Sequence, residues 1–320
     1  MDWYHYVLIA LGIIILFGLL PLIIVARYVF NQIFLRKNTE KDYVDFEEFK
    51  PHLKPYETLI RNNFKYLRSL DKIEHEIVSD DGLKLKGFYV NNNSDTTVIF
   101  VHGYQSTPFN SFSGAAKALH KKGYNLFFVY QRAHGKSEGQ YVTFGIKERK
   151  DILKWTHKIN EVYSPKNIII YGISMGCATS SMALSLNMPS NVKCAVLDCG
   201  FNKPHKEIVH ESKNMGKKGG EIIIYFVNIY CKLIAGFSLF ETSASKSLSK
   251  VTIPCLFIHS EGDKMVLPIN TIENYNACAS KHKKMIMYPK VGHGLTYLDG
   301  HPDIENQMLK FVDNAINESW

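Results

Sequence analysis

The chain has 320 residues, of which 46% are hydrophobic, 21% are charged and 12% are aromatic. This length and apolar content exclude a disordered chain and a mini-protein that needs disulfides or metals to fold, and they fit one large α/β domain or two small ones. The formal net charge of +8 is modest and would suit contact with anionic lipid, contact with nucleic acid, or solubility alone.

The six cysteines are spread along the chain, and no CxxC, HExxH or comparable Cys/His spacing occurs. This pattern predicts neither a disulfide framework nor a metal site, and free thiols favour a reducing compartment. Phosphate-binding glycine loops and a basic stripe with interleaved aromatic residues are also absent. We therefore expect no cofactor and no nucleic-acid partner.

The first predicted element is an apolar helix over residues 7–26, which contain no charge. Such a helix is roughly 30 Å long, which matches the hydrocarbon core of a bilayer. Aromatic residues of the kind found at membrane interfaces flank it at positions Trp3, Tyr4, Tyr6 and Tyr28. No Lys or Arg precedes it, unlike in a secretory signal peptide. Residues 1–30 are therefore predicted to be an uncleaved, single-pass transmembrane anchor in which Pro21 introduces a kink.

Basic residues flank only the C-terminal side of this span, at Arg27, Arg36, Lys37 and Lys41. The positive-inside rule then predicts that the large C-terminal part lies in the cytoplasm. Residues 31–72 are predicted to form a connector with an amphipathic helix near 56–70. We expect this helix to pack on the following domain rather than on the membrane.

A hairpin of two strands around Asp81-Gly82 begins the main domain at residue 73. Beyond it, short apolar runs alternate with helical patterns, which indicates a mostly parallel sheet with helices on both faces. The predicted strands are 97–102, 124–130, 167–171, 192–198, 253–259 and 284–288. The predicted helices are 109–121, 145–161, 175–187, 268–280 and 302–318. Residues 201–250 are too long for a simple crossover and are predicted to be an inserted helical cap within the domain 73–320.

The sharpest chemical signal is Gly172-Ile-Ser174-Met-Gly176, which follows a β-branched run and precedes a helix of small residues. A serine on a tight strand-to-helix turn needs small residues two positions away on either side. The turn lifts its hydroxyl above the carboxyl edge of the sheet, where open α/β sheets place their sites. Ser174 is therefore the predicted nucleophile.

A serine hydroxyl needs a base, and the base needs an orienting acid. His293, in a Gly-His-Gly loop after the last predicted strand, is the predicted base, and its rivals are His102, His134 and His259. Asp263, just beyond the preceding strand, is the predicted acid. Its main rival is Asp198 at the end of the strand before, and Glu261 is a weaker one. This gives the chain order nucleophile, acid, base.

An oxyanion that forms on the substrate needs two fixed donors. We expect them to be the backbone N–H of Met175, after the nucleophile, and the backbone N–H of Tyr104, in the loop after the strand 97–102. Cys177 is expected to be a packed small residue. The cap lysines at 203, 206, 213, 217 and 218, followed by the apolar stretch 222–234, suit either a packed cap or contact with anionic lipid.

Between residues 73 and 318 the sequence resembles the α/β-hydrolase superfamily. The stretches Gln131-Arg-Ala-His134-Gly-Lys-Ser137-Glu-Gly139 and Asp198-Cys-Gly-Phe201 are similar to those of bacterial membrane-anchored serine hydrolases of the Bem46-like and α/β-hydrolase-domain 12/13-like group. The resemblance implies an α/β-hydrolase fold and a serine hydrolase without a cofactor. We expect Arg132, His134 and Ser137 to fix their loop.

The expected activity is cleavage of a carboxylic ester, with a small-molecule or lipid ester as substrate. One alternative is an amidase or peptidase, which would use the same triad. Another is a catalytically silent hydrolase fold that serves as a membrane interaction module, since a fold by itself does not guarantee an activity. The sequence predicts no oligomeric state and does not fix the acyl chain.

Overall fold

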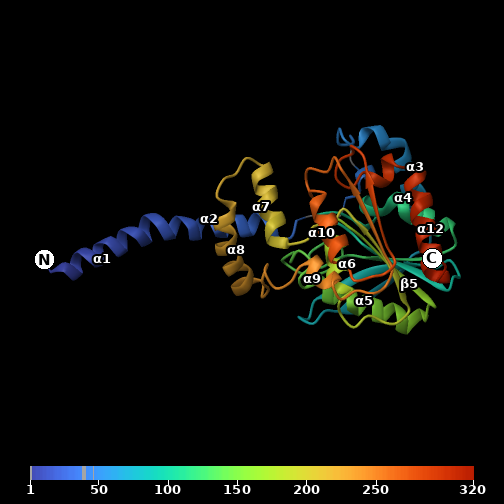
Figure 1. Ribbon diagram of the computed structural model, residues 1–320, viewed down its shortest axis with the longest axis horizontal. Coiled ribbons are helices and arrows are strands. Elements are labelled where there is room, and N and C mark those ends of the chain that lie inside the picture. Colours follow the sequence, from blue (N-terminus) through green and yellow to red (C-terminus); the bar gives the residue numbers. More distant parts are fainter. Residues whose placement is uncertain (1, 38–40, 46) are drawn as a thin grey trace.

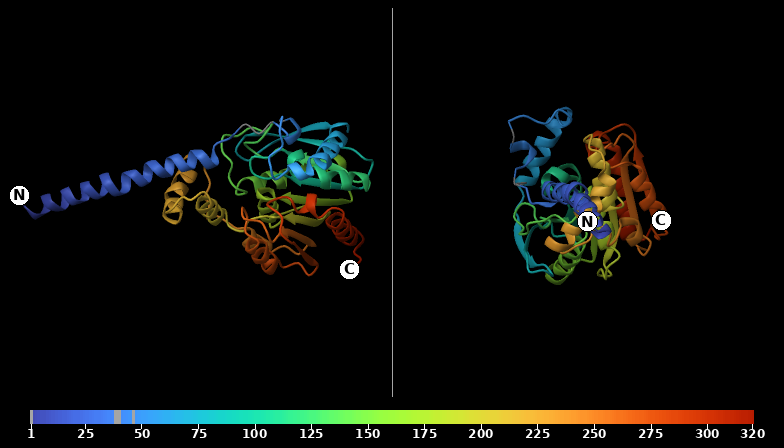
Figure 2. Two further views of the ribbon diagram at one scale, coloured as in Figure 1. Left: turned by 90° about the horizontal axis from the view of Figure 1, so that it is seen from above. Right: turned by 90° about the vertical axis from the view of Figure 1, so that its left-hand side faces the viewer.

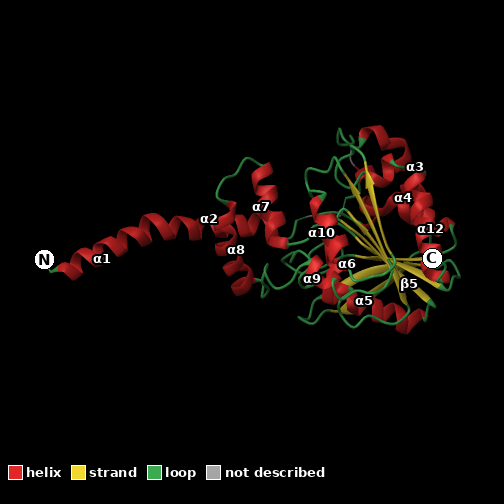
Figure 3. Ribbon diagram, in the orientation of Figure 1, coloured by secondary structure: helices red, strands yellow, loops and turns green. Residues whose placement is uncertain are grey.

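A long N-terminal helix projects from a domain whose central sheet has helices on both faces (Figures 1 and 3). The computed structural model describes residues 2–37, 41–45 and 47–320. The strands are β1 (Ile73–Val78), β2 (Lys84–Val90), β3 (Thr96–Val101), β4 (Asn125–Val129), β5 (Asn167–Ile173), β6 (Val192–Asp198), β7 (Cys255–Ser260) and β8 (Lys283–Tyr288). The helices packed on the sheet and around it are α3 (Glu57–Arg68), α4 (Pro108–Lys121), α5 (Glu148–Tyr163), α6 (Met175–Ala183), α9 (Ala244–Leu248), α10 (Ile269–Ala277), α11 (Thr296–Asp299) and α12 (Asp303–Asn317).

The eight strands follow the order β1-β2-β4-β3-β5-β6-β7-β8. The pairs β1–β2 and β2–β4 are antiparallel, and every later pair is parallel. The predicted α/β-hydrolase fold and its leading hairpin are thus confirmed. Because β5, β7 and β8 lie in the same parallel half of the sheet, the loops that follow them emerge at one edge.

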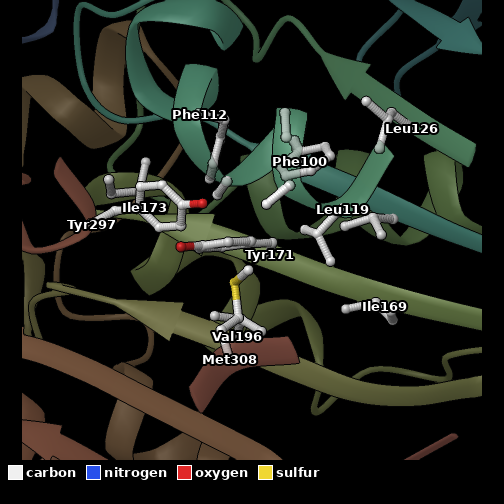
Figure 4. Close-up of a cluster of buried hydrophobic side chains, with 14 of the residues drawn as sticks. Phe100, Phe112, Leu119, Leu126, Ile169, Tyr171, Ile173, Val196, Tyr297 and Met308 are labelled. Atoms are coloured by element: carbon white, nitrogen blue, oxygen red, sulfur yellow. The ribbon is translucent and has the colours of Figure 1, made fainter. Parts of the chain in front are cut away.

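The central strands β3, β4 and β5 are buried almost throughout, because helices cover both faces of the sheet. Alternate side chains therefore enter two separate cores. One core contains Phe100 and Tyr171 under α4 and α12 (Figure 4). The other contains Ile99 and Trp155 under α5 and α6. These two apolar layers hold the sheet edge rigidly in place beneath the site.

The cap predicted over residues 201–250 consists of α7 (Pro204–Asn214) and α8 (Gly220–Ile234), followed by α9. Both α7 and α8 lie on the side of the domain from which the anchor projects (Figures 1 and 2). The insertion therefore lies beside the C-terminal part of the N-terminal helix, against Phe30 and Phe34.

The N-terminal helix is continuous from Trp3 to Phe34, and within the described residues it is the one helix long and apolar enough to cross a bilayer. It consists of α1 (Trp3–Ile13), a π-helical stretch η1 (Ile14–Leu19) and α2 (Leu20–Phe34). Pro21 is the second residue of α2 and comes shortly after the π-helical stretch. The helix extends beyond the predicted boundary at residue 30 because Phe30 and Phe34 are buried against the cap.

The connector contains two short 3₁₀ turns, η2 (Tyr43–Asp45) and η3 (Lys54–Tyr56), and the amphipathic helix α3. The apolar face of α3 is buried at Ile60, Phe64 and Leu67. The ring centroid of Phe64 lies 6.0 Å from that of Phe109 in α4. The apolar face of this helix therefore packs on α4.

Candidate active site

Ser174 lies at the sharp turn between β5 and α6. Its φ of 55° and ψ of −122° are rare for a residue other than glycine. A Cβ on Gly172 would lie 2.4 Å from the carbonyl oxygen of Gly176, and a Cβ on Gly176 would lie 1.8 Å from that of Val101. The two glycines are therefore required by close backbone contact, and the turn holds the serine at the carboxyl edge of the sheet.

The loops after β7 and β8 bring Asp263 and His293 to this serine. The Nε2 atom of His293 is 2.8 Å from Ser174 Oγ, and its Nδ1 atom is 2.6 Å from Asp263 Oδ2. The other carboxylate oxygen, Oδ1, accepts the backbone N–H groups of Met265 and Val266 at 2.9 and 3.0 Å. With Nδ1–H donating to Asp263, the Nε2 lone pair is free to accept the serine proton.

His259 is a second neighbour of Asp263. The sequence suggested His259 only as a rival base. Its Nε2 lies 3.2 Å from Asp263 Oδ2 and 2.8 Å from the carbonyl oxygen of Val266, and its Nδ1 is 2.6 Å from Thr271 Oγ1. Burial on its own would raise the pKa of Asp263, but hydrogen bonds with His259 and His293 outweigh it and lower the pKa to about 2. The carboxylate is therefore ionised at neutral pH. His259 lies near the end of β7, four residues before Asp263. This position was the signal that could have indicated its contact with Asp263.

Neither rival acid forms a hydrogen bond to His293 among the described residues. Asp198 ends β6, and its backbone carbonyl accepts the N–H of Ser174 at 2.9 Å. Its side-chain Oδ1 has no hydrogen-bond partner among the described residues. Burial raises the pKa of Asp198 to about 6, which is the opposite of what a permanently ionised orienting group requires. Glu261 is exposed at the surface.

The rival bases His102 and His134 are buried within the backbone framework. The Nε2 atom of His102 accepts the N–H of Gln131 at 3.1 Å, and that of His134 accepts the N–H of Gln105 at 3.0 Å. Burial lowers the pKa of His102 to about 3 and that of His134 to about 4. Both imidazoles are therefore neutral, and their lone pairs are already used.

The glycine loop after β3 lies directly against the serine. A Cβ on Gly103 would lie 3.4 Å from Ser174 Cβ and 3.8 Å from its Oγ, so the loop is in van der Waals contact with the serine. Tyr104 follows Gly103. On the other side of the serine in the chain, Met175 is the first residue of α6. The first N–H groups of a helix have no intrahelical acceptor and carry a partial positive charge, which suits them to receive a developing anion.

The Arg-x-His-Gly-x-Ser loop is fixed by side-chain contacts, as expected. Arg132 forms a buried ion pair with Asp151 at 2.7 Å and a second pair with Asp81 at 2.9 Å. The Ser137 hydroxyl donates to the carbonyl of Tyr130 at 2.6 Å. These contacts hold the loop in place. Through His134, which accepts the N–H of Gln105, the loop supports the glycine loop after β3.

Tyr104 connects the site to the anchor helix. Its hydroxyl donates to the carbonyl oxygen of Ile33 at 2.6 Å. Its ring centroid is 5.2 Å from that of Phe144, which lies 5.5 Å from that of Phe34. The guanidinium of Arg36 donates to two backbone carbonyls of the Arg-x-His-Gly-x-Ser loop. The end of α2 is thus bonded to both loops that border the serine.

One group of possible metal ligands coincides with this site. The ligand atoms of Cys199, Asp263 and His293 lie within 4.8 Å of one another. Ligands around a tetrahedral zinc ion are roughly 3 Å or more apart, whereas the Asp263–His293 distance of 2.6 Å fits a shared proton. Burial also raises the pKa of Cys199 well above its ordinary value, so the thiol stays protonated. This donor set fits proton transfer better than metal binding.

Glu207, on α7, is a buried acid near the site, with 6% of its surface exposed. Burial, together with the charges of Glu211 and Asp263, raises the pKa of Glu207 from 4.5 to about 8. The folded state therefore retains a proton that the unfolded state releases, and stability falls as the pH rises through this range. We expect Glu207→Gln to be more stable than the unmodified protein. The difference in the free energy of unfolding should grow from pH 5 to pH 8 at up to about 1.4 kcal/mol per pH unit. It should be visible as a difference in melting temperature that grows over the same range.

Differential scanning fluorimetry across this pH range measures the margin. Glu161→Gln is the matched control, because the side chain of Glu161 is 76% exposed. That variant should follow the unmodified protein at every pH. A Glu207→Gln margin that stays constant with pH would show that Glu207 titrates near its ordinary value.

The sheet topology and the strand-to-helix turn at Ser174 define the class: the chain is an α/β-hydrolase-fold protein. The family model for the alpha/beta hydrolase fold matches residues 96–219, which include this turn. The solved structure of the esterase Pf2001 from Pyrococcus furiosus superposes with a TM-score of 0.65 at 24% identity, covering 79% of this chain and 95% of that one. This likeness concerns the fold.

The relatives include the Bem46-like proteins. Bem46 from Schizosaccharomyces pombe is 24% identical, over 80% of this chain and 79% of its own. The membrane protein YNL320W from Saccharomyces cerevisiae is 20% identical, over 73% of this chain and 78% of its own. YqkD from Bacillus subtilis is 23% identical over 98% of both chains, so that alignment extends over the N-terminal helix as well.

Proposed function

We propose that this protein is a membrane-anchored serine hydrolase that cleaves carboxylic esters. One observation carries the proposal: His293 stands between Ser174 Oγ at 2.8 Å and Asp263 Oδ2 at 2.6 Å. This is the arrangement in which an imidazole can take a proton from a hydroxyl while a carboxylate stabilises the resulting imidazolium. The fold it shares with a solved esterase adds support.

In the first half of the proposed reaction, Ser174 Oγ attacks the ester carbonyl carbon while its proton moves to His293 Nε2. The carbonyl electron pair moves onto the oxygen, and the N–H groups of Met175 and Tyr104 stabilise this oxyanion. The C–O bond to the alcohol then breaks, and His293 returns the proton to the leaving oxygen. The products are a free alcohol and an acyl group on Ser174.

In the second half, His293 takes a proton from water as the water oxygen attacks the acyl carbon. Collapse of the second tetrahedral intermediate breaks the bond to Ser174 Oγ, which regains a proton from His293. A carboxylic acid is released. Asp263 stays ionised throughout and holds the imidazole in the tautomer that both halves require.

The helix Trp3–Phe34 anchors the enzyme in the proposal, with the domain on the side of Arg27, Arg36 and Lys37. A cytoplasmic domain agrees with six cysteines that are all buried free thiols. Tethering to a bilayer favours an acyl-lipid ester as the substrate.

A burst experiment tests the proposal. Purified full-length protein with a p-nitrophenyl ester should release one equivalent of p-nitrophenolate before the steady state, and a fluorophosphonate probe should label it covalently. A matched p-nitroanilide should turn over much more slowly. Faster turnover of the anilide would indicate an amidase or peptidase, and the absence of both burst and labelling would indicate a catalytically silent fold.

A further inference from the structure

The outer face of the cap helix α8 carries a row of exposed apolar side chains. Ile222, Tyr225, Ile229 and Leu233 are 60%, 63%, 50% and 78% exposed. Their spacing of three, four and four residues places them on one face of the helix. The inner face is buried at Ile224, Val227 and Cys231. The helix is thus apolar on two opposite faces, only one of which is covered by protein.

This exposed row is extended by a neighbouring aromatic side chain. Phe240, which is 40% exposed, stacks on Tyr225 with ring centroids 5.4 Å apart. Contiguous apolar patches on a protein surface mark places where a partner or a membrane binds. We call the five residues Ile222, Tyr225, Ile229, Leu233 and Phe240 the α8 patch.

The contacts of α8 with the anchor fix its level along the membrane normal. The Tyr230 hydroxyl lies 3.3 Å from the carbonyl oxygen of Ile23, within the apolar run of the anchor. The guanidinium of Arg27 lies over the Tyr230 ring at 5.5 Å, and the Phe30 ring centroid is 6.1 Å from it. Arg27 is the first charge after some 30 Å of apolar helix, so it belongs at the headgroup level. α8 therefore lies at the depth where hydrocarbon meets headgroups.

The direction of α8 agrees with this depth. It runs across the anchor helix rather than along it (Figure 1), and it is seen nearly end-on in the left view of Figure 2. If the anchor crosses the bilayer, a helix with this direction lies roughly in the membrane plane. An in-plane helix with an apolar face toward the acyl chains is the usual form of an interfacial membrane contact.

The charges near the patch favour an anionic surface. Lys217 and Lys218 are exposed in the turn that precedes α8, and Lys232 is exposed on the helix. None of the three forms an ion pair within the described ranges of the chain. Each cation near an anionic leaflet strengthens membrane binding.

We infer that the α8 patch is a second membrane-contact surface that lies in the interface of an anionic bilayer and brings the cap and the site beneath it to the lipid. The inference rests on the anchoring in the proposed function. A further cluster of buried apolar side chains, separate from the two cores of the sheet, connects this contact to the site. It includes Phe34 of the anchor, Val227 of α8, and Met175 next to the proposed nucleophile. The favoured substrate class is therefore an ester presented in the membrane.

Fluorescence quenching in vesicles tests this inference with the full-length chain. A nitrobenzoxadiazole probe is attached to Ile229→Cys, to Phe17→Cys in the anchor, or to Val162→Cys, a 45% exposed position on α5. Protein without an added cysteine gives the background, since all six native thiols are buried. The vesicles contain phosphatidylcholine, with or without phosphatidylglycerol, and a lipid that carries a nitroxide either near its headgroup, which reports on position 229, or on its acyl chain, which reports on position 17 in the middle of the span.

The expected result is strong quenching and a blue-shifted emission at position 229 but not at position 162. Lys217→Glu combined with Lys218→Glu should remove the increase in quenching that phosphatidylglycerol produces. Quenching at position 17 with none at position 229 would overturn the inference while leaving the anchor intact, whereas no quenching at either position would overturn both. Crosslinking of position 229 between two copies, without quenching, would assign the patch to a dimer and also overturn it. Fluorophosphonate labelling of the same samples reports separately on the hydrolase.

Discussion

Ser174→Ala is expected to lower kcat for a p-nitrophenyl ester by about 10⁴-fold or more and to abolish fluorophosphonate labelling. The reason is that the hydroxyl at 2.8 Å from His293 Nε2 is the only group of the protein that forms a bond to the acyl carbon in the proposed reaction. Alanine has no atom that can replace it.

Steady-state kinetics and gel-based labelling measure this effect. Ser185→Ala is the matched control: this half-buried serine lies just after α6, where its hydroxyl donates only to the carbonyl of Met182. It should retain both turnover and labelling. Labelling that persists in Ser174→Ala would remove Ser174 from the proposed role, and circular dichroism would show whether the variant is folded.

Asp263→Asn is expected to lower kcat by about 10⁴-fold with little change in KM. In the unmodified protein, the carboxylate oxygen of Asp263 accepts a hydrogen bond from His293 Nδ1 and holds the proton on that nitrogen. An amide can present its NH₂ group to the imidazole instead, which favours the tautomer with the proton on Nε2. That tautomer cannot accept the serine proton.

Asp198→Asn serves as the comparison, because Asp198 contacts Ser174 through its backbone carbonyl, which the substitution preserves. It should retain most of the activity. A larger loss in Asp198→Asn than in Asp263→Asn would transfer the orienting role to Asp198. The pH dependence of kcat for both variants shows whether the remaining activity still depends on a titrating base.

Most of the sheet could be predicted because its strands are short apolar runs between Gly, Pro and polar residues. The run 192–198 has the observed bounds of β6. The predicted strand 253–259 begins too early, because Pro254 cannot donate a ladder hydrogen bond and β7 starts at Cys255. The helix predicted from residue 145 begins at Glu148, because Gly145 has φ 90°.

The predicted triad residues are brought together because their order along the chain reflects the order of neighbouring parallel strands. Contacts that do not follow from the order of the parallel strands could not be predicted. Residues 31–34 are assigned to the connector by the sequence, whereas Phe34 is buried against Phe237 of the cap, some two hundred residues later. The double contact of Asp263 with His259 and His293 likewise depends on side-chain directions that a sequence pattern does not contain.

The bonds between the end of α2 and the loops around Ser174 have a practical consequence for anyone who removes the hydrophobic N-terminus to obtain water-soluble protein. A truncation after residue 36 would take away Phe30 and Phe34, uncover Phe144 and Phe237, and leave the Tyr104 hydroxyl without its acceptor at Ile33. The shortened chain would expose new apolar surface beside the proposed active site. Detergent-solubilised protein that keeps residues 23–36 is the better starting material for enzymology and crystallisation.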